Sequence, residues 1–280
     1  MELTQPSQSI TQKQKIPFFL GPCVLESLTL ALDVAGYLTE NLKGLEQDIQ
    51  LIFKGSFDKA NRTSIDSYRG PGLEKGLAIF EEVKKYYSLP VVTDFHTPEQ
   101  ANEIASVVDY LQVPAFLCRQ TDMILEGAKA CAKFHRKLKV KKGQFLAPED
   151  TKNIVDKALN YLKHEDILLT ERGTSFGYQR LIVDMTSFHV MKSFGVKTIH
   201  DATHCVQMPS AAGKTSGGKR EFIPILARAA FASGADGAFM ECHPDPSNAK
   251  SDASTSLSLP ECIGLVKDLV KLKKSLAYDK

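Results

Sequence analysis

The feature that most constrains this chain is an eightfold alternation of short apolar runs and stretches with helical periodicity. Each run ends in a polar tip and leads into a segment such as SLTLALDVAGYLTENL, whose apolar residues recur at helical spacing. Eight such units predict a (β/α)8 TIM barrel, with a doubly wound open sheet as the alternative. We predict the strands at 18–23, 50–57, 89–96, 110–116, 137–145, 167–173, 196–204 and 236–244.

The polar ends of these runs favour the barrel over the open sheet. The C-terminal ends of the predicted strands carry the motifs GPC, KGSFDK, TDFH, KKGQF, ERG, DATH and ECHP. In a barrel those ends converge on one face around one axis, so residues far apart in sequence share a single site. An open sheet would spread the same residues along a crevice.

Length and composition fit this architecture as a single α/β domain. A chain of 280 residues is long enough for one barrel, and 43% hydrophobic with 24% charged residues is typical of a globular protein. This composition excludes a disordered, collagenous or coiled-coil chain. We expect residues 1–15 to be a polar lead-in and residues 16–280 to form the barrel domain.

Charge and cysteine content indicate the surroundings in which the chain works. The formal net charge is only +2, so no bulk field drives the protein onto nucleic acid or an anionic membrane. No apolar run approaches the roughly 20 residues of a membrane span, and the first residues lack a secretory-signal pattern. Six sparse, irregularly spaced cysteines predict free thiols. We therefore expect a cytoplasmic protein without nucleic-acid or membrane partners.

Four potential metal ligands stand at or just past the first, seventh and eighth strands, namely Cys23, His204, Glu241 and Asp252. Barrel closure makes the first and eighth strands neighbours, so these residues can meet. One sulfur, one nitrogen and carboxylate oxygens suit Zn²⁺, Fe²⁺, Mn²⁺ or Co²⁺ better than Mg²⁺ or Ca²⁺. Taken singly, Cys23 is better explained as a buried small hydrophobe and His204 as a core histidine. Adjoining donors leave a different ligand set open: Cys205, Cys242 and His243.

Cationic residues gather at the same predicted strand ends. These are Lys54, Lys59, Arg62, Arg119, Lys141, Lys142 and Arg172, accompanied by Ser56, Asn61, Thr63 and Gln144. So many cations at one mouth, against a small net charge, predict multiply anionic substrates, since arginine binds phosphate and carboxylate bidentately. Surface solvation is the ordinary explanation for any one of them, and it suits Lys59 and Lys75. Lys54 and Lys141 lie among apolar strand residues, which makes that explanation weaker.

Residue patterns alone leave the chemistry of the mouth open. A lysine inside a barrel can form a Schiff base, and the residues do not separate that role from an electrostatic one. The carboxylates are too numerous for a unique acid–base assignment: Asp94, Glu171, Asp201 and Asp252. The glycine-containing loop 214–221 lacks phosphate-loop spacing and is a weak candidate for a lid or a phosphate contact.

A family resemblance narrows these possibilities. The segments KGSFDKANRTS, QVPAFLCRQTD, VKKGQFLAP, LTERGTSFGY, HDATHCVQMP, SGGKREF and MECHPDP…AKSDAST resemble the 3-deoxy-D-manno-octulosonate 8-phosphate synthases. The resemblance runs from about Phe18 to the last helix, and KANRTS and RQTD are its most specific parts. It implies a (β/α)8 barrel, commonly a homotetramer. The implied reaction condenses phosphoenolpyruvate with D-arabinose 5-phosphate and releases phosphate, toward bacterial lipopolysaccharide.

The resemblance also implies roles for individual residues. Lys59 and Lys141 would meet phosphoenolpyruvate, with Arg172 on its phosphate and Ser56 near its carboxylate. The remaining residues implied to bind substrate are Asn61, Arg62 and Thr63 for the sugar phosphate, Arg119 of a neighbouring subunit for its phosphate, and Phe116 beside phosphoenolpyruvate. The residues implied near the reacting atoms are Lys54, Lys59, Asp94, Lys141, His204 and Asp252.

The GPC motif implies the metal-dependent branch of the family, in which Cys23 stands where other members carry Asn. His204, Glu241 and Asp252 would complete the ligand set. Two positions depart from the family pattern, since Thr63 replaces a more usual Ser and Lys139 replaces a common Asn.

Three rivals remain. The sister synthase that uses erythrose 4-phosphate usually carries KPRTS where this chain has KANRTS. A Schiff-base aldolase and a catalytically inactive binding barrel are the others.

Overall fold

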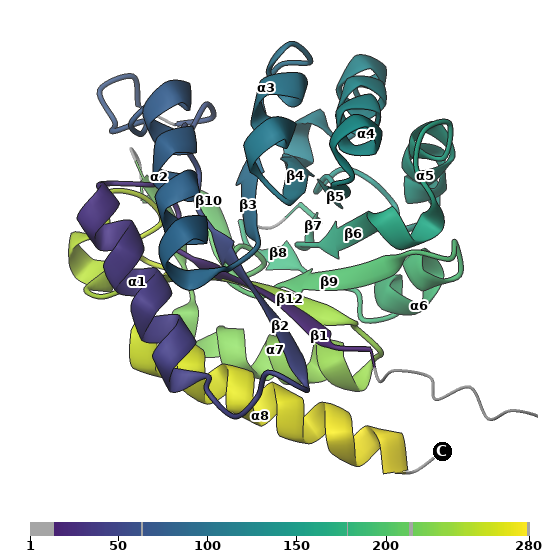
Figure 1. Ribbon diagram of the computed structural model, residues 1–280. Helices are drawn as coiled ribbons and strands as arrows, with labels where there is room; N and C mark the ends of the chain where they lie inside the picture. Colours follow the sequence, from purple (N-terminus) through teal and green to yellow (C-terminus); the bar gives the residue numbers. More distant parts are fainter. Residues whose placement is uncertain (1–13, 63, 178, 213–214, 279–280) are drawn as a thin grey trace, which may run out of the picture.

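The computed structural model describes residues 14–62, 64–177, 179–212 and 215–278, and within them the predicted barrel is confirmed. The parallel pairing of β1 with β12 closes eight strands on themselves (Figure 1). The barrel strands are β1 Ile16–Gly21, β2 Ile49–Lys54, β3 Val91–Asp94, β4 Tyr110–Val113, β5 Lys137–Lys141, β6 Ile167–Glu171, β9 Lys197–Asp201 and β12 Gly237–His243.

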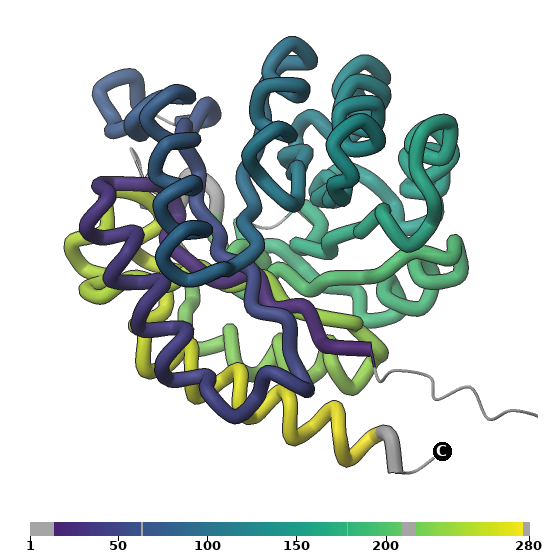
Figure 2. Tube along the Cα trace, in the orientation of Figure 1, coloured from purple at the N-terminus to yellow at the C-terminus, as the bar shows by residue number. Residues whose placement is uncertain are grey.

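Helices surround the barrel and cover the outer faces of its strands. Figure 2 shows the path of the chain through these strands and helices. They are α1 Leu28–Asn41, α2 Leu73–Tyr87, α3 Gln100–Val107, α4 Thr121–Phe134, α5 Lys152–Ala158, α6 Ser187–Lys192, α7 Ile223–Ala232 and α8 Leu259–Tyr278. The N-cap of α1 is Ser27, whose hydroxyl accepts from the Leu30 amide at 3.1 Å. A large apolar cluster fills the space between strands and helices.

Among the described residues, five shorter strands lie at the C-terminal face of the barrel, outside its eight strands. They are β7 Thr174–Ser175, β8 Leu181–Ile182, β10 Gln207–Ala212, β11 Thr215–Gly218 and β13 Leu257–Ser258. Residues 213–214, inside the β10–β11 connection, lie outside the described residues, so the role of loop 214–221 stays a prediction. None of the described helices combines the length and apolar character that crossing a membrane requires.

An apolar layer fills the inside of the barrel. Seven strands each contribute one buried residue to it: Phe19, Ile52, Val92, Tyr110, Leu168, Ile199 and Phe239. The eighth strand, β5, contributes Lys139, which lies opposite Leu168 in the register of β5 with β6. The Lys139 Nζ lies 5.1 Å from the Phe19 ring centre and 4.7 Å from that of Phe239.

A polar layer lies directly above the apolar one. Side chains alternate along a strand, so the residue two positions further on faces the same side. That step leads to Gly21, Lys54, Asp94, Gln112, Lys141, Thr170, Asp201 and Glu241. The apolar layer is therefore the floor of a charged site that lies at the C-terminal face of the barrel. Barrel enzymes carry their catalytic residues at this face.

Candidate active site

The floor of the site begins where β1 and β2 approach closely. Gly21 has φ +155°, and a Cβ there would collide with the carbonyl oxygen of Lys54, so this position requires glycine. The Lys54 ammonium turns inward and donates to Pro22 O at 3.1 Å, Cys23 O at 2.6 Å and Glu241 Oε1 at 2.6 Å. Lys54 and Glu241 are buried, so the pair ties β1, β2 and β12 together at the floor.

A cluster of metal-type donors lies on this floor. One donor atom each from Cys23, Glu241 and Asp252 lie within 4.8 Å of one another. Cys23 Sγ donates to Asp252 Oδ2 at 3.0 Å. His204 Nε2 lies 3.4 Å from Glu241 Oε1 and 3.6 Å from Asp252 Oδ2, which places all four predicted ligands side by side. Sulfur, imidazole and carboxylate donors together suit a borderline divalent ion.

Charges around this cluster shift the pKa of each donor. Burial, with the neighbouring Asp252 and Glu241, raises the pKa of the Cys23 thiol. Burial also opposes ionisation of Asp252, but Lys59 and His204 outweigh it and hold the pKa of Asp252 well below its usual range. A neutral thiol beside ionised carboxylates is the state expected before a cation displaces the thiol proton.

Asp201 connects the cluster to the cation of β5. Its Oδ1 lies 2.9 Å from His204 Nδ1 and accepts from the His204 backbone amide at 3.0 Å. Its Oδ2 lies 2.8 Å from Lys141 Nζ. Burial opposes ionisation of Asp201, yet His204 and Lys141 hold its pKa well below the usual range. The carboxylate therefore fixes the His204 ring with Nε2 toward Glu241 and Asp252.

A second carboxylate, Asp94, lies in the polar layer on β3. It accepts from Ser56 Oγ at 3.1 Å and from Gln112 Nε2. Burial opposes its ionisation, but Lys141, His96 and Lys54 lower the pKa of Asp94 below its usual range. Asp94 is therefore an anion surrounded by cations. Hydrogen bonds from two neutral donors, Ser56 and Gln112, fix the orientation of its carboxylate.

Arg172 and Lys59 lie at the mouth, and both are linked to Asp252, Lys59 directly and Arg172 through Gln207. Arg172 Nη2 donates to Gln207 Oε1 at 3.0 Å, and Gln207 Nε2 donates to Asp252 Oδ1 at 3.1 Å. Lys59 Nζ lies 3.4 Å from Asp252 Oδ2. Arg172 Nη1 is buried without a hydrogen-bond partner among the described residues. A buried guanidinium with an open donor is suited to an anionic ligand.

The remaining predicted residues lie on the rim. Arg62 donates to Ser251 Oγ at 2.6 Å and to Lys250 O at 3.1 Å, next to Asp252 in the chain. Asn61, Phe116 and Arg119 are exposed, and the Phe116 side chain is 56% exposed. Thr63 lies outside the described residues.

Lys142 differs from the expectation that it faces the mouth. It is fully buried, pairs with Glu171 Oε2 at 3.5 Å, and donates to Leu146 O at 3.1 Å and Thr174 Oγ1 at 3.0 Å. Because successive strand residues point to opposite faces, Lys141 and Lys142 cannot both face the barrel axis. Lys142 therefore holds the loops after β5 and β6 together, and Glu171 balances its charge.

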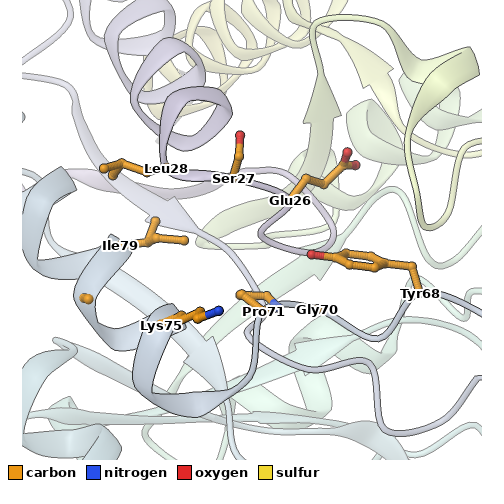
Figure 3. A pocket seen from close by; sticks show the side chains of 9 residues that line it. Glu26, Ser27, Leu28, Tyr68, Gly70, Pro71, Lys75 and Ile79 are labelled. Carbon is orange, nitrogen blue, oxygen red and sulfur yellow. The ribbon is translucent and has the colours of Figure 1, made fainter.

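A hollow of about 580 Å³ lies outside the barrel, between the starts of α1 and α2. Nine residues line it, among them Glu26, Tyr68 and Lys75, whose side chains Figure 3 shows. None of these nine is a predicted site residue. The Tyr68 hydroxyl donates to Leu25 O at 3.2 Å, so the hollow borders the loop after β1. Its lining does not include the metal-type donors Cys23, Glu241 and Asp252.

Three residues of the site received no individual role from the sequence, although Asp201 was among the carboxylates expected at the mouth. Gln112 links Asp94 to the barrel interior, Asp201 links His204 to Lys141, and Gln207 links Arg172 to Asp252. Gln112 and Asp201 each stand two positions after a residue of the apolar layer, so strand periodicity carried a signal for them. Gln207 is the first residue of β10, outside the eight barrel strands, and no strand periodicity marked it.

Comparison with known proteins places the chain in a family. The model described as "DAHP synthetase I family" matches residues 3–277. A protein of Francisella tularensis subsp. holarctica is 51% identical, covering 92% of this chain and 94% of its own. Proteins of Paracidovorax citrulli and Desulfatibacillum aliphaticivorans are 49% and 47% identical, covering 91% of this chain and 90% and 91% of their own. All three are named 2-dehydro-3-deoxyphosphooctonate aldolase. The chain belongs to the DAHP synthetase I family.

Proposed function

We propose that this protein condenses phosphoenolpyruvate with D-arabinose 5-phosphate and water, giving 3-deoxy-D-manno-octulosonate 8-phosphate and phosphate. The reaction would serve lipopolysaccharide biosynthesis. The shared name of relatives at about half identity over nine tenths of the chain supports this activity. The single structural observation that carries it is a cation-lined mouth directly above a cluster of sulfur, imidazole and carboxylate donors.

Phosphoenolpyruvate carries two anionic groups, and cations at the mouth offer partners for both. Arg172, with its open buried Nη1, would bind the phosphate. Lys59 and Lys141 would neutralise the rest of the molecule, and Ser56 would lie near its carboxylate. Phe116 would cover it from the rim. Fixed cations around the reacting carbon stabilise charge that develops in the transition state.

Arabinose 5-phosphate would enter along the rim. Asn61, Arg62 and Thr63 would hold it, and Arg119 of a neighbouring subunit would reach its phosphate. The exposure of Phe116 and Arg119 in a single chain supports a role for both next to a partner subunit. We also propose a homotetramer, the assembly that the family resemblance implies.

Cys23, His204, Glu241 and Asp252 would hold a divalent ion: Zn²⁺, Fe²⁺, Mn²⁺ or Co²⁺. The fit is supported by Glu241 Oε2, which is buried and has no hydrogen-bond partner among the described residues. The donor set of one thiol, one imidazole and two carboxylates suits these ions better than Mg²⁺ or Ca²⁺. When bound, such an ion would polarise the aldehyde oxygen or orient a water molecule.

The bond changes follow from the substrates. Carbon 3 of the enol phosphate attacks the aldehyde carbon, forming the C–C bond, while water adds at carbon 2. The resulting intermediate loses phosphate by cleavage of the C–O bond at carbon 2. Lys54, Lys141 and Arg172 would stabilise the charge near carbon 2, and Asp94, His204 and Asp252 would orient the hydroxyl and water protons. The rest of the rate enhancement would come from holding the two mutually repelling anionic substrates together in the reactive orientation.

The alternatives are less well supported. A Schiff base needs a neutral amine. Burial lowers the pKa of Lys54, but Glu241 and Cys23 outweigh it, so the pKa of Lys54 is raised. Lys141 is paired with Asp201. Erythrose 4-phosphate as the acceptor is disfavoured by the names of the relatives. We also propose a cytoplasmic location, because the six cysteines are free and buried, as in reducing compartments.

The decisive assay measures phosphate release from phosphoenolpyruvate with arabinose 5-phosphate or erythrose 4-phosphate, each before and after chelation. Turnover with the five-carbon sugar only, lost on chelation and restored by a divalent ion, is the expected result. Turnover that survives complete metal removal would retain the synthase and refute the metal role of Cys23. Preference for erythrose 4-phosphate, or product trapped on a lysine by borohydride, would refute the proposed reaction.

A further inference from the structure

Lys139 is an amine placed where the other barrel strands supply apolar side chains. It is fully buried and lies opposite Leu168 of β6 and Gln112 of β4 in the barrel register. It therefore belongs to the apolar layer beneath the site and does not reach the mouth. An amine in such a layer is costly unless it is hydrogen-bonded.

The contacts of Lys139 are specific. Its Nζ donates to Gln112 Oε1 at 2.6 Å and lies over the ring faces of Phe19 and Phe239. Burial, together with the charge of Lys141, holds the pKa of Lys139 well below its usual range. A lowered pKa reduces the cost of keeping the amine in this layer.

The chemistry of the partners fixes the direction of this hydrogen-bond chain. A carboxylate only accepts, so Gln112 must turn Nε2 toward Asp94. Its Oε1 then faces the barrel interior, where Lys139 supplies the donor. Asp94 takes its other donor from Ser56 at the mouth. The four side chains form one ordered path from the barrel interior to the site.

We propose that Lys139 is a positioning residue for the reaction centre, which acts by fixing the Gln112 amide and thereby the orientation of the Asp94 carboxylate. Its role in turnover rests on the proposed function. Without this donor, Gln112 Oε1 would be buried and unpaired, and the amide would gain by rotating or shifting. Asp94 would then lose its fixed donor and sample other orientations.

Two variants of similar size separate hydrogen bonding from packing. Lys139→Met keeps the length and removes the donor, whereas Lys139→Gln keeps a donor group. We expect kcat to fall about tenfold in Lys139→Met and to remain within about threefold of wild type in Lys139→Gln, which follows from leaving a buried acceptor unpaired. KM for both substrates should change by less than about twofold, because the mouth residues are untouched.

A double variant tests the route of the effect. In the Gln112→Leu background the path is already broken, so adding Lys139→Met should lower kcat no further. A merely structural role would instead give additive losses and equal effects of Met and Gln at position 139, and either result would overturn the proposal. If neither variant at position 139 folds, Gln112→Leu decides, since an unchanged kcat in that variant refutes the path.

Crystal structures keep the test independent of the proposed function. In Lys139→Met we expect the Gln112 amide and the Asp94 carboxylate to leave their wild-type positions or to occupy two. Unchanged positions overturn the proposal, whatever the activity. A wild-type enzyme that does not condense the two substrates refutes the proposed function alone, because the two crystal structures still decide whether Lys139 positions Asp94.

Discussion

Removing the ammonium of Lys54 provides the most quantitative test of how the site is built. In Lys54→Met, the Glu241 carboxylate loses a partner at 2.6 Å, and the carbonyls of Pro22 and Cys23 lose their donor. Both members of the pair are no more than 2% exposed, so solvent cannot replace what is lost. Breaking a buried pair by removing one partner costs about 3–5 kcal/mol. We expect the free energy of unfolding to fall by that amount.

The chain contains a matched control. Lys84 pairs with Asp109 at 2.9 Å, but their side chains are 32% and 23% exposed. Asp109 also keeps Arg136 at 3.2 Å and the amide of Val91 at 3.0 Å. Lys84→Met should therefore cost no more than about 1 kcal/mol. Both variants are compared by equilibrium urea unfolding in the presence of a chelator, so that metal binding does not contribute.

The effect of pH follows from the pKa of Glu241. Burial opposes its ionisation, but His204 and Lys54 outweigh burial and lower the pKa of Glu241. A lowered carboxyl pKa stabilises the fold above its unfolded value of about 4.3, and that stability is lost as pH falls. Without Lys54 the Glu241 pKa rises, so the deficit of Lys54→Met should be largest at pH 7 and shrink toward about pH 4.

Two results would refute this reasoning. One is a loss in Lys54→Met no larger than that in Lys84→Met at pH 7. The other is a double variant Lys54→Met/Glu241→Gln that loses as much as the two single variants added together. Removing both charges should be less costly than that sum, because neither ion is then left buried alone.

Three further predictions follow. Cys23→Ala should lower bound metal, measured by elemental analysis, and activity together, whereas Cys118→Ala should keep both; full metal content in Cys23→Ala contradicts the ligand role. Burial lowers the pKa of His200 to about 4, so stability present above about pH 6.5 is lost as pH falls toward 4, by roughly 3 kcal/mol. His200→Phe should flatten that decline in urea unfolding, and an unchanged slope counts against it. Arg119→Ala should raise KM for arabinose 5-phosphate about tenfold and leave KM for phosphoenolpyruvate unchanged; the reverse pattern would reassign the residue.

Strand periodicity was enough to predict the barrel and the face that carries the site. Each predicted strand overlaps an observed one, and the ends differ by a few residues because loop residues after a strand are often apolar too. Phe116 illustrates this, since it was predicted at the end of a strand and lies in a 3-10 turn. The metal-type donors were likewise predictable, because barrel closure makes the first and last strands neighbours.

The sequence alone could not say which charges pair. Lys141 and Lys142 are adjacent and identical, yet one meets Asp201 inside the barrel and the other meets Glu171 outside it. Strand alternation requires that they separate, but only the strand's orientation in the barrel decides which residue faces inward. The family resemblance supplied that choice for Lys141, and nothing in the sequence supplied the opposite role of Lys142.

By itself the sequence determined the architecture, the face of the site and the kinds of donors there, because these depend on local periodicity and on residue type. Only the tertiary structure decided the path from Lys139 through Gln112 to Asp94, and the bridge from Arg172 through Gln207 to Asp252. These links join side chains from different strands and loops at hydrogen-bond distance. Such distances are set by how the closed barrel packs around Phe239, where the side-chain nitrogens of Lys54, Lys139 and Lys141 lie 5.5, 4.7 and 3.9 Å from the ring centre.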